Sequence, residues 1–269
     1  MTPWAEVIGQ PIAQSKSPLI HRFWLEALGL PGDYRATSVE TADLASFLDG
    51  RRGDPLWRGC NVTMPHKQAV LDLAEDRGNL RETIGAANTL FRDEDGGLVA
   101  TNTDAAGFFE PIAGLDLTGR TVTVVGAGGA ARAVLFALAR MNVGEVVLLN
   151  RTPLKAAALL HRFGLKGRVA GLDAMAPPSA LIVNASALGM SGQPVWVPDL
   201  SGQGDECVVY DLVYHPIETP LLQAAADAGL ATIDGLDMLI GQARVAFELF
   251  FGQAPPDDRD EALRARLLA

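Results

Sequence analysis

The residues with the clearest chemical signal are small ones. The segment Gly126–Ala131 follows Thr121–Val125, a run made almost wholly of β-branched residues. Such a run predicts a strand buried on both faces of a parallel sheet. Helical periodicity then covers Arg132–Arg140, and the apolar run Glu145–Leu149 predicts the next strand. The stretch is therefore expected to form a β-α-β unit with a glycine-rich turn after its first strand.

The small residues in this turn have separable roles. Gly126 permits a tight turn, Gly128 lets the backbone approach a pyrophosphate, and Ala131 lets the helix lie close to the strand. Phosphates can rest on the free N–H groups at the helix start, where the helix dipole favours negative charge. We therefore predict a dinucleotide site here, against the alternative of a purely structural turn.

The end of the second strand indicates which dinucleotide binds. NAD sites usually carry Asp or Glu there to hold the ribose 2′-hydroxyl. This strand ends in Asn150-Arg151-Thr152, with Lys155 just beyond. A guanidinium can grip a 2′-phosphate with paired charge-assisted hydrogen bonds or stack on the adenine. The sequence thus favours NADP over NAD; the alternative is that Arg151 and Lys155 are ordinary solvated charges.

Polar residues near the N-terminus could hold an anion. Ser17 and Pro18 are expected to open a helix, because Ser is a good N-cap and Pro suits the first helical position. Ser15 and Ser17 would then bracket a helix N-terminus, where an anion is favoured. The alternative is that Ser17 serves only as a cap.

Lys67 is the cation best placed for chemistry. The predicted strand Trp57–Thr63 is stopped by Pro65, which cannot donate to a ladder. Lys67 follows at the expected start of a helix that carries Val70 and Leu71. A lysine at a helix N-terminus opposes the dipole, and such local conflicts are often found at functional sites.

These residues need elements to position them, and the sequence predicts an α/β fold with two parts. The first hundred residues form one α/β unit, and the boundary falls near Asp104. A strand is also predicted at Gly85–Phe91, and later strands are predicted at Ala180–Asn184, Cys207–Asp211 and Ala231–Ile233. Because ligands bind beyond the carboxyl ends of parallel strands, a nicotinamide should lie at the loops near Ala185 and Leu212.

A long helix should follow Asp234-Gly235, with Gln242 lying off its apolar stripe. Gln242 could therefore be a site residue or simply exposed to solvent.

Composition bounds the function class. The chain has 269 residues, 48% of them hydrophobic and 20% charged, as in an ordinary globular protein. The formal net charge of -10 argues against a nucleic-acid surface. No basic region with an apolar core opens the chain, and no apolar run could span a bilayer, so we expect a cytoplasmic protein without a membrane partner. Cys60 and Cys207 match no metal-ligand spacing and are expected to be reduced and buried.

Several motifs occur in order along nearly the whole chain: Ser15–Pro18, Asn61–Lys67, Gly85–Thr89, Asn102–Asp104, Gly126–Arg132, Asn150–Thr152, Tyr210–Tyr214 and Asp234–Leu239 with Gln242. Together they resemble the shikimate dehydrogenase family. The resemblance implies a substrate domain at 1–104, onto which 236–269 packs, and a Rossmann-type NADP-binding domain at 105–235. It also implies NADPH-dependent reduction of 3-dehydroshikimate to shikimate, in aromatic amino-acid biosynthesis.

The resemblance assigns roles residue by residue. Lys67 matches the catalytic lysine and Asp104 its carboxylate partner. The substrate contacts that it implies are Ser15, Ser17, Thr63, Asn88, Asp104, Tyr214 and Gln242. The cofactor contacts that it implies are Gly126, Ala127, Gly128, Gly129, Ala130, Asn150, Arg151, Thr152, Lys155, Leu212 and Gly235. No metal is implied.

The chemistry agrees with these roles. Hydride transfer to a ketone builds negative charge on its oxygen, so the site must supply a proton or a positive charge there. Lys67 can supply either, and Asp104 could orient it and accept from a substrate hydroxyl. A carboxylate raises a lysine's pKa whereas desolvation lowers it, and the sequence leaves the balance open.

Three positions depart from the family pattern. Ala105 stands where glycine is common, His66 where phenylalanine is frequent, and Leu212 where methionine is often found. None removes a group that the chemistry needs. Ala105 and His66 could shift binding strength or pH dependence.

Two alternative functions remain at this point. One is a quinate/shikimate dehydrogenase that uses NAD, against which Asn150-Arg151-Thr152 argues. The other is a non-catalytic NADP-binding regulator, against which the pair Lys67 and Asp104 argues. The expected partner is a small-molecule substrate, and a monomer or a homodimer is expected.

Overall fold

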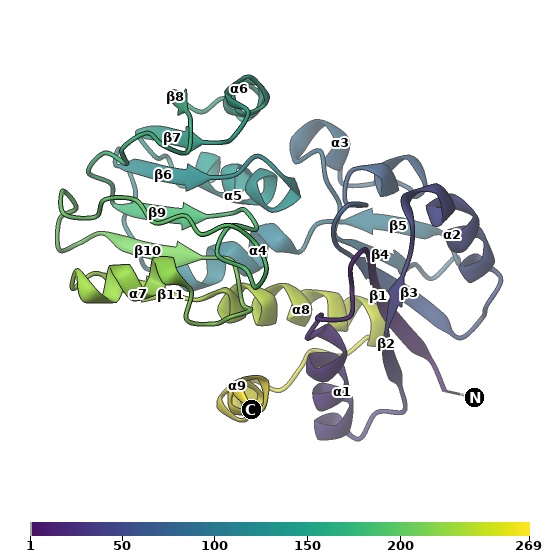
Figure 1. Cartoon of the computed structure of the whole chain (residues 1–269). Coiled ribbons are helices and arrows are strands. Elements are labelled where there is room, and N and C mark those ends of the chain that lie inside the picture. The colour runs from purple at the N-terminus through teal and green to yellow at the C-terminus, as the bar shows by residue number, and fades with distance from the viewer. Residues whose placement is uncertain (1) are drawn as a thin grey trace. The chain divides into compact units, whose positions relative to one another are not determined.

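The computed structural model describes residues 2–269, apart from the side chain of Lys155 (Figure 1). The chain divides into two compact units. The first contains the residues up to Thr103 together with Ile240–Ala269, and the second contains Asp104–Leu239. Both units have the α/β composition that the sequence predicts.

The first unit is built on a five-stranded mixed sheet, with strand order β2-β1-β3-β4-β5. Strand β1 pairs in parallel with β2 and β3, whereas β3, β4 and β5 pair antiparallel. The strands are β1 Trp4–Gly9, β2 Asp33–Ser38, β3 Trp57–Val62, β4 Thr89–Arg92 and β5 Leu98–Thr101. Because β3 and β4 are neighbours, their polar side chains can meet in the centre of the sheet.

Several helices complete the first unit. They are α1 Ser17–Leu28, α2 Leu44–Arg52, α3 Leu80–Thr83 and α9 Asp260–Leu268, with one-turn 3₁₀ helices at Thr41–Asp43, Ala69–Asp72 and Asp257–Arg259. The helix α8, Gly235–Phe251, begins in the second unit and continues in the first. Its Phe250 packs with Val7 and Tyr34 in one apolar cluster.

The second unit is a six-stranded parallel sheet with strand order β11-β10-β9-β6-β7-β8, which Figure 1 shows. The strands are β6 Thr121–Val125, β7 Glu145–Leu149, β8 Gly167–Ala170, β9 Leu181–Asn184, β10 Val208–Asp211 and β11 Ala231–Ile233. Its helices are α4 Asp104–Phe109, α5 Gly129–Arg140, α6 Pro153–Arg162 and α7 Pro220–Asp227, with a 3₁₀ turn at Glu110–Ile112. The strand order reverses between β6 and β9, which is the position where doubly wound sheets bind ligands.

Both faces of this sheet are covered, as the apolar strands require. Val122 and Val124 point to one face and pack with α4, α5 and α6. Ile182 and Val209 point to the other face and pack with α7. Side chains alternate between the faces of a strand, so a strand with a core on each side must be apolar throughout.

Three local predictions were wrong. The helix expected after Lys67 is a single 3₁₀ turn at Ala69–Asp72. The chain leaves it because Glu75 exchanges backbone hydrogen bonds with the β5 strand, at 2.8 and 2.9 Å. The N-cap of α1 is Lys16 rather than Ser17, and the Ser15 hydroxyl accepts from the Ser17 N–H at 3.3 Å. The strand expected from Gly85 starts only at Thr89.

Within residues 2–269, no helix combines the length and the apolar content needed to cross a bilayer.

Candidate functional site

The glycine-rich turn has the geometry that the sequence predicts. Gly126 has a φ of +108°, and a Cβ atom there would lie 2.8 Å from the Ala185 carbonyl oxygen. Gly128 precedes the first residue of α5 at a φ of -88°, and a Cβ atom there would have no neighbour within 4 Å. Gly126 thus brings β6 and β9 close together, whereas Gly128 leaves open the space in front of the helix N-terminus.

Substitution of the two glycines should therefore have different effects, on stability at Gly126 and on cofactor binding at Gly128. Gly126→Ala should lower the free energy of unfolding by about 1–3 kcal/mol, because it puts a side chain at a positive φ against backbone. Gly128→Ala should leave the free energy of unfolding within about 0.5 kcal/mol but raise the Michaelis constant for a dinucleotide. Chemical denaturation and steady-state kinetics of both variants check this. Equal destabilisation of the two would contradict it.

The end of β7 lacks a carboxylate, as predicted. The Asn150 side-chain amide donates to the Thr152 carbonyl oxygen at 2.9 Å, which shapes the turn before α6. Arg151 and Thr152 are exposed there. The side chain of Lys155 lies outside the described part of the structure. Arg151 can therefore turn toward a phosphate at this strand end without breaking a packed contact.

The loops after β9 and β10 are joined at their starts. The Leu212 N–H donates to the Asn184 carbonyl oxygen at 3.0 Å. The buried Asp211 carboxylate accepts from the Asn184 side chain at 2.9 Å, the Val213 N–H at 3.0 Å and the Thr219 hydroxyl at 2.7 Å. Burial raises the pKa of Asp211 to about 6, although these hydrogen bonds oppose the shift. The predicted nicotinamide loops thus lie side by side, with their backbones fixed.

Gly235 packs against the same loop. A Cβ atom on Gly235 would lie 2.6 Å from the carbonyl oxygens of both Leu212 and Val213. The start of α8 can therefore approach the β10 loop only without a side chain. This contact gives a physical reason for glycine at a position that the sequence motif alone did not explain.

Another group of predicted residues lies in the first unit. Thr63 follows β3, its N–H donates to the Ile8 carbonyl oxygen at 2.9 Å, and its carbonyl accepts from His66. The Lys67 carbonyl oxygen accepts from the Ala87 N–H at 2.7 Å, which places the Lys67 backbone beside the segment that carries Asn88. The Lys67 side chain is half-buried.

Asn88 and Gln242 meet in the interior of this unit. The Asn88 amide donates to the Thr103 hydroxyl at 2.9 Å and to Gln242 Oε1 at 3.4 Å, and the Thr103 N–H donates to Asn88 Oδ1 at 2.7 Å. Gln242 is only 7% exposed, so the alternative of plain surface exposure is wrong for it. Residues far apart in the sequence thus converge on one polar cluster.

His66, one of the departures from the family pattern, is fully buried. Its Nε2 atom bonds to the Val39 carbonyl oxygen at 2.8 Å, so this nitrogen carries the proton. His66 therefore fixes the turn before Lys67.

Ser15 and Ser17 also lie in the first unit, and the remaining predicted residues fall in the second. Asp104 is the first residue of α4 and is buried, directly after Thr103. Tyr214 lies in the loop after β10, where burial raises its pKa. The cofactor residues that the sequence predicts all belong to this unit. The predicted pairing of Lys67 with Asp104 stays a prediction.

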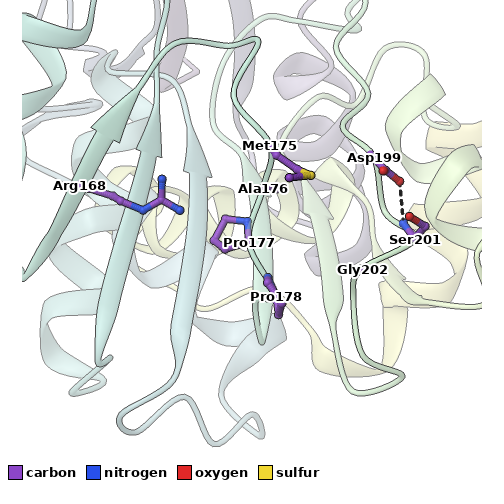
Figure 2. Close-up of a pocket in the computed structure, with 8 residues that line it drawn as sticks. All are labelled: Arg168, Met175, Ala176, Pro177, Pro178, Asp199, Ser201 and Gly202. Carbon is purple, nitrogen blue, oxygen red and sulfur yellow. Dashed lines mark hydrogen bonds between the residues drawn. The ribbon is translucent and has the colours of Figure 1, made fainter.

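A surface hollow of about 430 Å³ lies elsewhere in the second unit (Figure 2). It is lined by residues that include Arg168, Met175, Pro177, Asp199 and Ser201. The Asp199 carboxylate accepts from the Ser201 N–H at 2.9 Å and so is part of a turn. None of the predicted site residues lines this hollow. Among the described residues, no three His, Cys, Asp or Glu side chains gather to hold a metal ion.

Comparison with known protein families gives three matches along the chain. Residues 7–90 match the shikimate dehydrogenase substrate binding domain, and residues 110–185 match shikimate / quinate 5-dehydrogenase. Residues 235–263 match the shikimate 5'-dehydrogenase C-terminal domain. The matches cover both units.

Individual relatives agree with these matches. The chain is 64% identical to the shikimate dehydrogenase (NADP(+)) of Sphingopyxis alaskensis over 268 residues, covering 100% of this chain and 98% of the relative. Its fold resembles that of shikimate 5-dehydrogenase from Thermus thermophilus, solved with NADP(H) and shikimate, at a TM-score of 0.85, 38% identity and complete coverage of both chains. It also resembles quinate dehydrogenase from Corynebacterium glutamicum in complex with NAD, at a TM-score of 0.86 and 31% identity, covering 98% of this chain and 99% of the other.

Proposed function

Because this chain belongs to the shikimate dehydrogenase family, it catalyses the NADP-dependent interconversion of 3-dehydroshikimate and shikimate, and we propose that Lys67 provides the proton in that reaction. The reaction belongs to aromatic amino-acid biosynthesis. The observation that carries the proposal for Lys67 is its position. It is a half-buried cation whose backbone is bonded to the segment that carries the buried Asn88.

The proposed role of Lys67 follows from charge. The carbonyl oxygen of the substrate becomes negative as hydride arrives, and an ammonium group aimed at it can donate a proton or stabilise the charge. We assign Asp104 as the group that orients Lys67 and accepts a hydrogen bond from a ring hydroxyl. The burial of Asp104 at the start of a helix supports a fixed position for its carboxylate.

The remaining substrate contacts are proposals of the same kind. Ser15 and Ser17 would hold the substrate carboxylate at the N-terminus of α1, where helix N–H groups favour an anion. Asn88, Gln242 and Thr63 would bind the ring hydroxyls, and Tyr214 would lie near the carboxylate. A buried polar cluster that contains Asn88 and Gln242 supports this assignment, because side chains so restrained are well suited to recognise fixed hydroxyl positions.

The second unit fits NADP. The open space at Gly128 admits a pyrophosphate to the N-terminus of α5, and Ala127, Gly129 and Ala130 complete the turn. Asn150, Arg151, Thr152 and Lys155 would hold the adenosine phosphate end, and Leu212 and Gly235 would bound the nicotinamide. When bound, NADPH supplies the hydride. We propose the first unit as the substrate domain and the second as the nucleotide domain. The sequence predicts these domains at 1–104 with 236–269 and at 105–235, and the two compact units divide after Thr103 and after Leu239.

Arg151 should set the cofactor preference. Arg151→Ala should raise the Michaelis constant for NADPH by about 10- to 100-fold, since charge-assisted hydrogen bonds to a 2′-phosphate contribute about 1.5–3 kcal/mol. The constant for NADH should change little, because NADH has no 2′-phosphate. Steady-state kinetics with both cofactors check this, with Arg168→Ala as the control for an exposed arginine in the same unit. An unchanged preference for NADPH would overturn the assignment.

A second candidate function is favoured by one observation, the likeness to a quinate dehydrogenase that binds NAD. The strand end Asn150-Arg151-Thr152 argues against it, because no carboxylate is present to hold an unphosphorylated ribose. Turnover of shikimate and of quinate with each of NADP and NAD, followed at the nicotinamide absorbance, tests the choice. Faster turnover of quinate with NAD would favour the second function.

We also propose that the protein works in the cytoplasm. Cys60 and Cys207 are both free and buried, which suits a reducing compartment. Burial raises the pKa of the Cys207 thiol to about 11 and that of Cys60 well above its usual range. A monomer or a homodimer stays a prediction, which light scattering on the purified protein would decide.

A further inference from the structure

A continuous chain of buried side-chain hydrogen bonds leads away from Asn88 into the core of the first unit. The Thr89 hydroxyl lies 3.2 Å from Asn88 Oδ1, and the Asn61 amide donates to Thr89 at 3.0 Å. The Tyr34 hydroxyl donates to Asn61 Oδ1 at 2.5 Å. Tyr34, Asn61, Thr89 and Asn88 are each 5% exposed or less. We call these four residues the polar relay.

The direction of every bond in the polar relay is fixed by one backbone group. The Thr103 N–H can only donate, so the oxygen of the Asn88 amide must face it. The Thr89 hydroxyl reaches the same oxygen and must therefore donate as well. Because the Thr89 proton is used there, Asn61 has to offer Thr89 its N–H group, and its oxygen then faces Tyr34.

Tyr34 is suited to be the last donor. Burial raises the pKa of Tyr34 well above its usual range, and Cys60 and Glu6 add to the shift, so the group stays a phenol. Its ring stacks on His21 with centroids 3.9 Å apart and planes inclined by 5°. Without this hydroxyl, the buried oxygen of Asn61 would lose its donor, and Asn61 could turn over.

The other end of the polar relay leads to Gln242. With its oxygen held by Thr103 and Thr89, Asn88 presents its N–H group to Gln242 Oε1, which the Thr103 hydroxyl also approaches at 3.4 Å. The oxygen of the Gln242 amide is thereby directed toward Asn88. The orientation of both amides decides whether each offers a donor or an acceptor to a hydroxylated ring.

We propose that Tyr34, Asn61 and Thr89 are positioning residues for substrate recognition: they set the orientation of the Asn88 and Gln242 amides, and so the pattern of donors and acceptors that meets the ring hydroxyls. This inference rests on the proposed roles of Asn88 and Gln242. An amide in the wrong orientation would meet a ring hydroxyl without a matching donor or acceptor, and the buried group left unpaired would weaken binding of the ring.

Four variants test the polar relay. Thr89→Val keeps the shape and removes the hydroxyl, whereas Thr89→Ser keeps the hydroxyl. Tyr34→Phe keeps the ring on His21 and removes the last donor. The matched control is Tyr210→Phe, a buried tyrosine in the second unit that also stacks on an aromatic ring, Phe108, with centroids 5.4 Å apart. Each is measured for its Michaelis constants for shikimate and for NADP, its kcat and its thermal unfolding midpoint.

We expect Thr89→Val and Tyr34→Phe to raise the Michaelis constant for shikimate about tenfold while that for NADP stays unchanged. Thr89→Ser should restore most of the affinity, and Tyr210→Phe should leave it at the wild-type value. A purely structural role would lower the unfolding midpoint and the active fraction, but not the Michaelis constant for shikimate alone. Equal constants for Thr89→Val, Thr89→Ser and wild type would overturn the proposal.

Gln242→Ala separates this inference from the function on which it rests. A raised Michaelis constant for shikimate in Gln242→Ala, with wild-type values in Thr89→Val and Tyr34→Phe, would show that Gln242 binds substrate without the polar relay. An unchanged constant in Gln242→Ala would overturn the role of Gln242 and the inference with it. Absence of shikimate turnover by the wild-type protein would instead contradict the proposed function.

Discussion

Lys67→Ala should lower kcat by a factor on the order of 10² to 10⁴, the range over which a general acid contributes to proton transfer. The Michaelis constant for NADPH should stay near its wild-type value, because every proposed cofactor contact is made by other residues. The half-buried position of Lys67 beside the Asn88 segment is the physical reason to expect an effect on chemistry rather than on folding. Steady-state and single-turnover kinetics with 3-dehydroshikimate check this.

Two further variants sharpen the result for Lys67. In Lys67→Arg, the guanidinium keeps the positive charge but binds its proton far more tightly than an ammonium group does. The variant therefore retains a fixed charge but cannot act as a proton donor. We expect it to be nearly as slow as Lys67→Ala. Lys166→Ala, an exposed lysine of the second unit, should turn over like wild type. A near-normal kcat in Lys67→Ala, with only a raised Michaelis constant, would falsify the role in the chemical step.

His21 should make the protein sensitive to acid. Burial lowers the pKa of His21 from 6.5 to about 3, although the Asn61 side chain opposes the shift, and the ring is fully buried between Tyr34 and the aromatic residues of α8. Between pH 6.5 and pH 3, His21 is therefore protonated in the unfolded chain but neutral in the folded protein. Stability from this group is present above pH 6.5 and is lost as the pH falls. The full difference corresponds to about 5 kcal/mol, of which about 3 kcal/mol is lost by pH 4.

A comparison of variants isolates the contribution of His21. His21→Phe keeps an aromatic ring on Tyr34 but cannot be protonated, so its free energy of unfolding should fall less than that of wild type between pH 7 and pH 4. His161→Gln replaces an exposed histidine and should follow the wild-type curve. Asp211 acts in the opposite direction, because its raised pKa adds stability as the pH falls below 6, but it is common to all three proteins. Parallel curves for wild type and His21→Phe would exclude the effect.

The elements that could be predicted from the sequence are strands that are apolar along their whole length and turns that are fixed by a short local motif. The strand β6 and the strand β11 have the bounds expected from composition, and Gly126 and Gly128 occupy the predicted turn. A strand buried on both faces must be apolar, and a turn of this kind demands glycine, so few alternatives exist. The strand β8, Gly167–Ala170, was missed because it lies at the sheet edge, begins with glycine and is partly exposed.

The polar cluster of the first unit depends on contacts between distant residues, which could not be predicted from the sequence. Gln242 lies 154 residues from Asn88, and the two meet because the C-terminal part of α8, from Ile240 onward, belongs to the first unit. Asn61 and Thr89 look like ordinary strand residues, and only the pairing of β3 with β4 reveals that they bond. The signal that could have found them is the presence of amide and hydroxyl side chains within otherwise apolar strands, since such groups need partners when buried.

The two cysteine thiols can serve as internal probes of how often each unit opens. Cys60 lies in β3, in the centre of the first sheet, and Cys207 lies directly before β10; both are buried in the folded protein. A small alkylating reagent can reach a buried thiol only when the surrounding sheet opens. The alkylation rate at Cys60 therefore reports how often the first unit opens, and the rate at Cys207 reports how often the second unit opens. The opening rates of the two units can therefore be measured separately in the unlabelled protein.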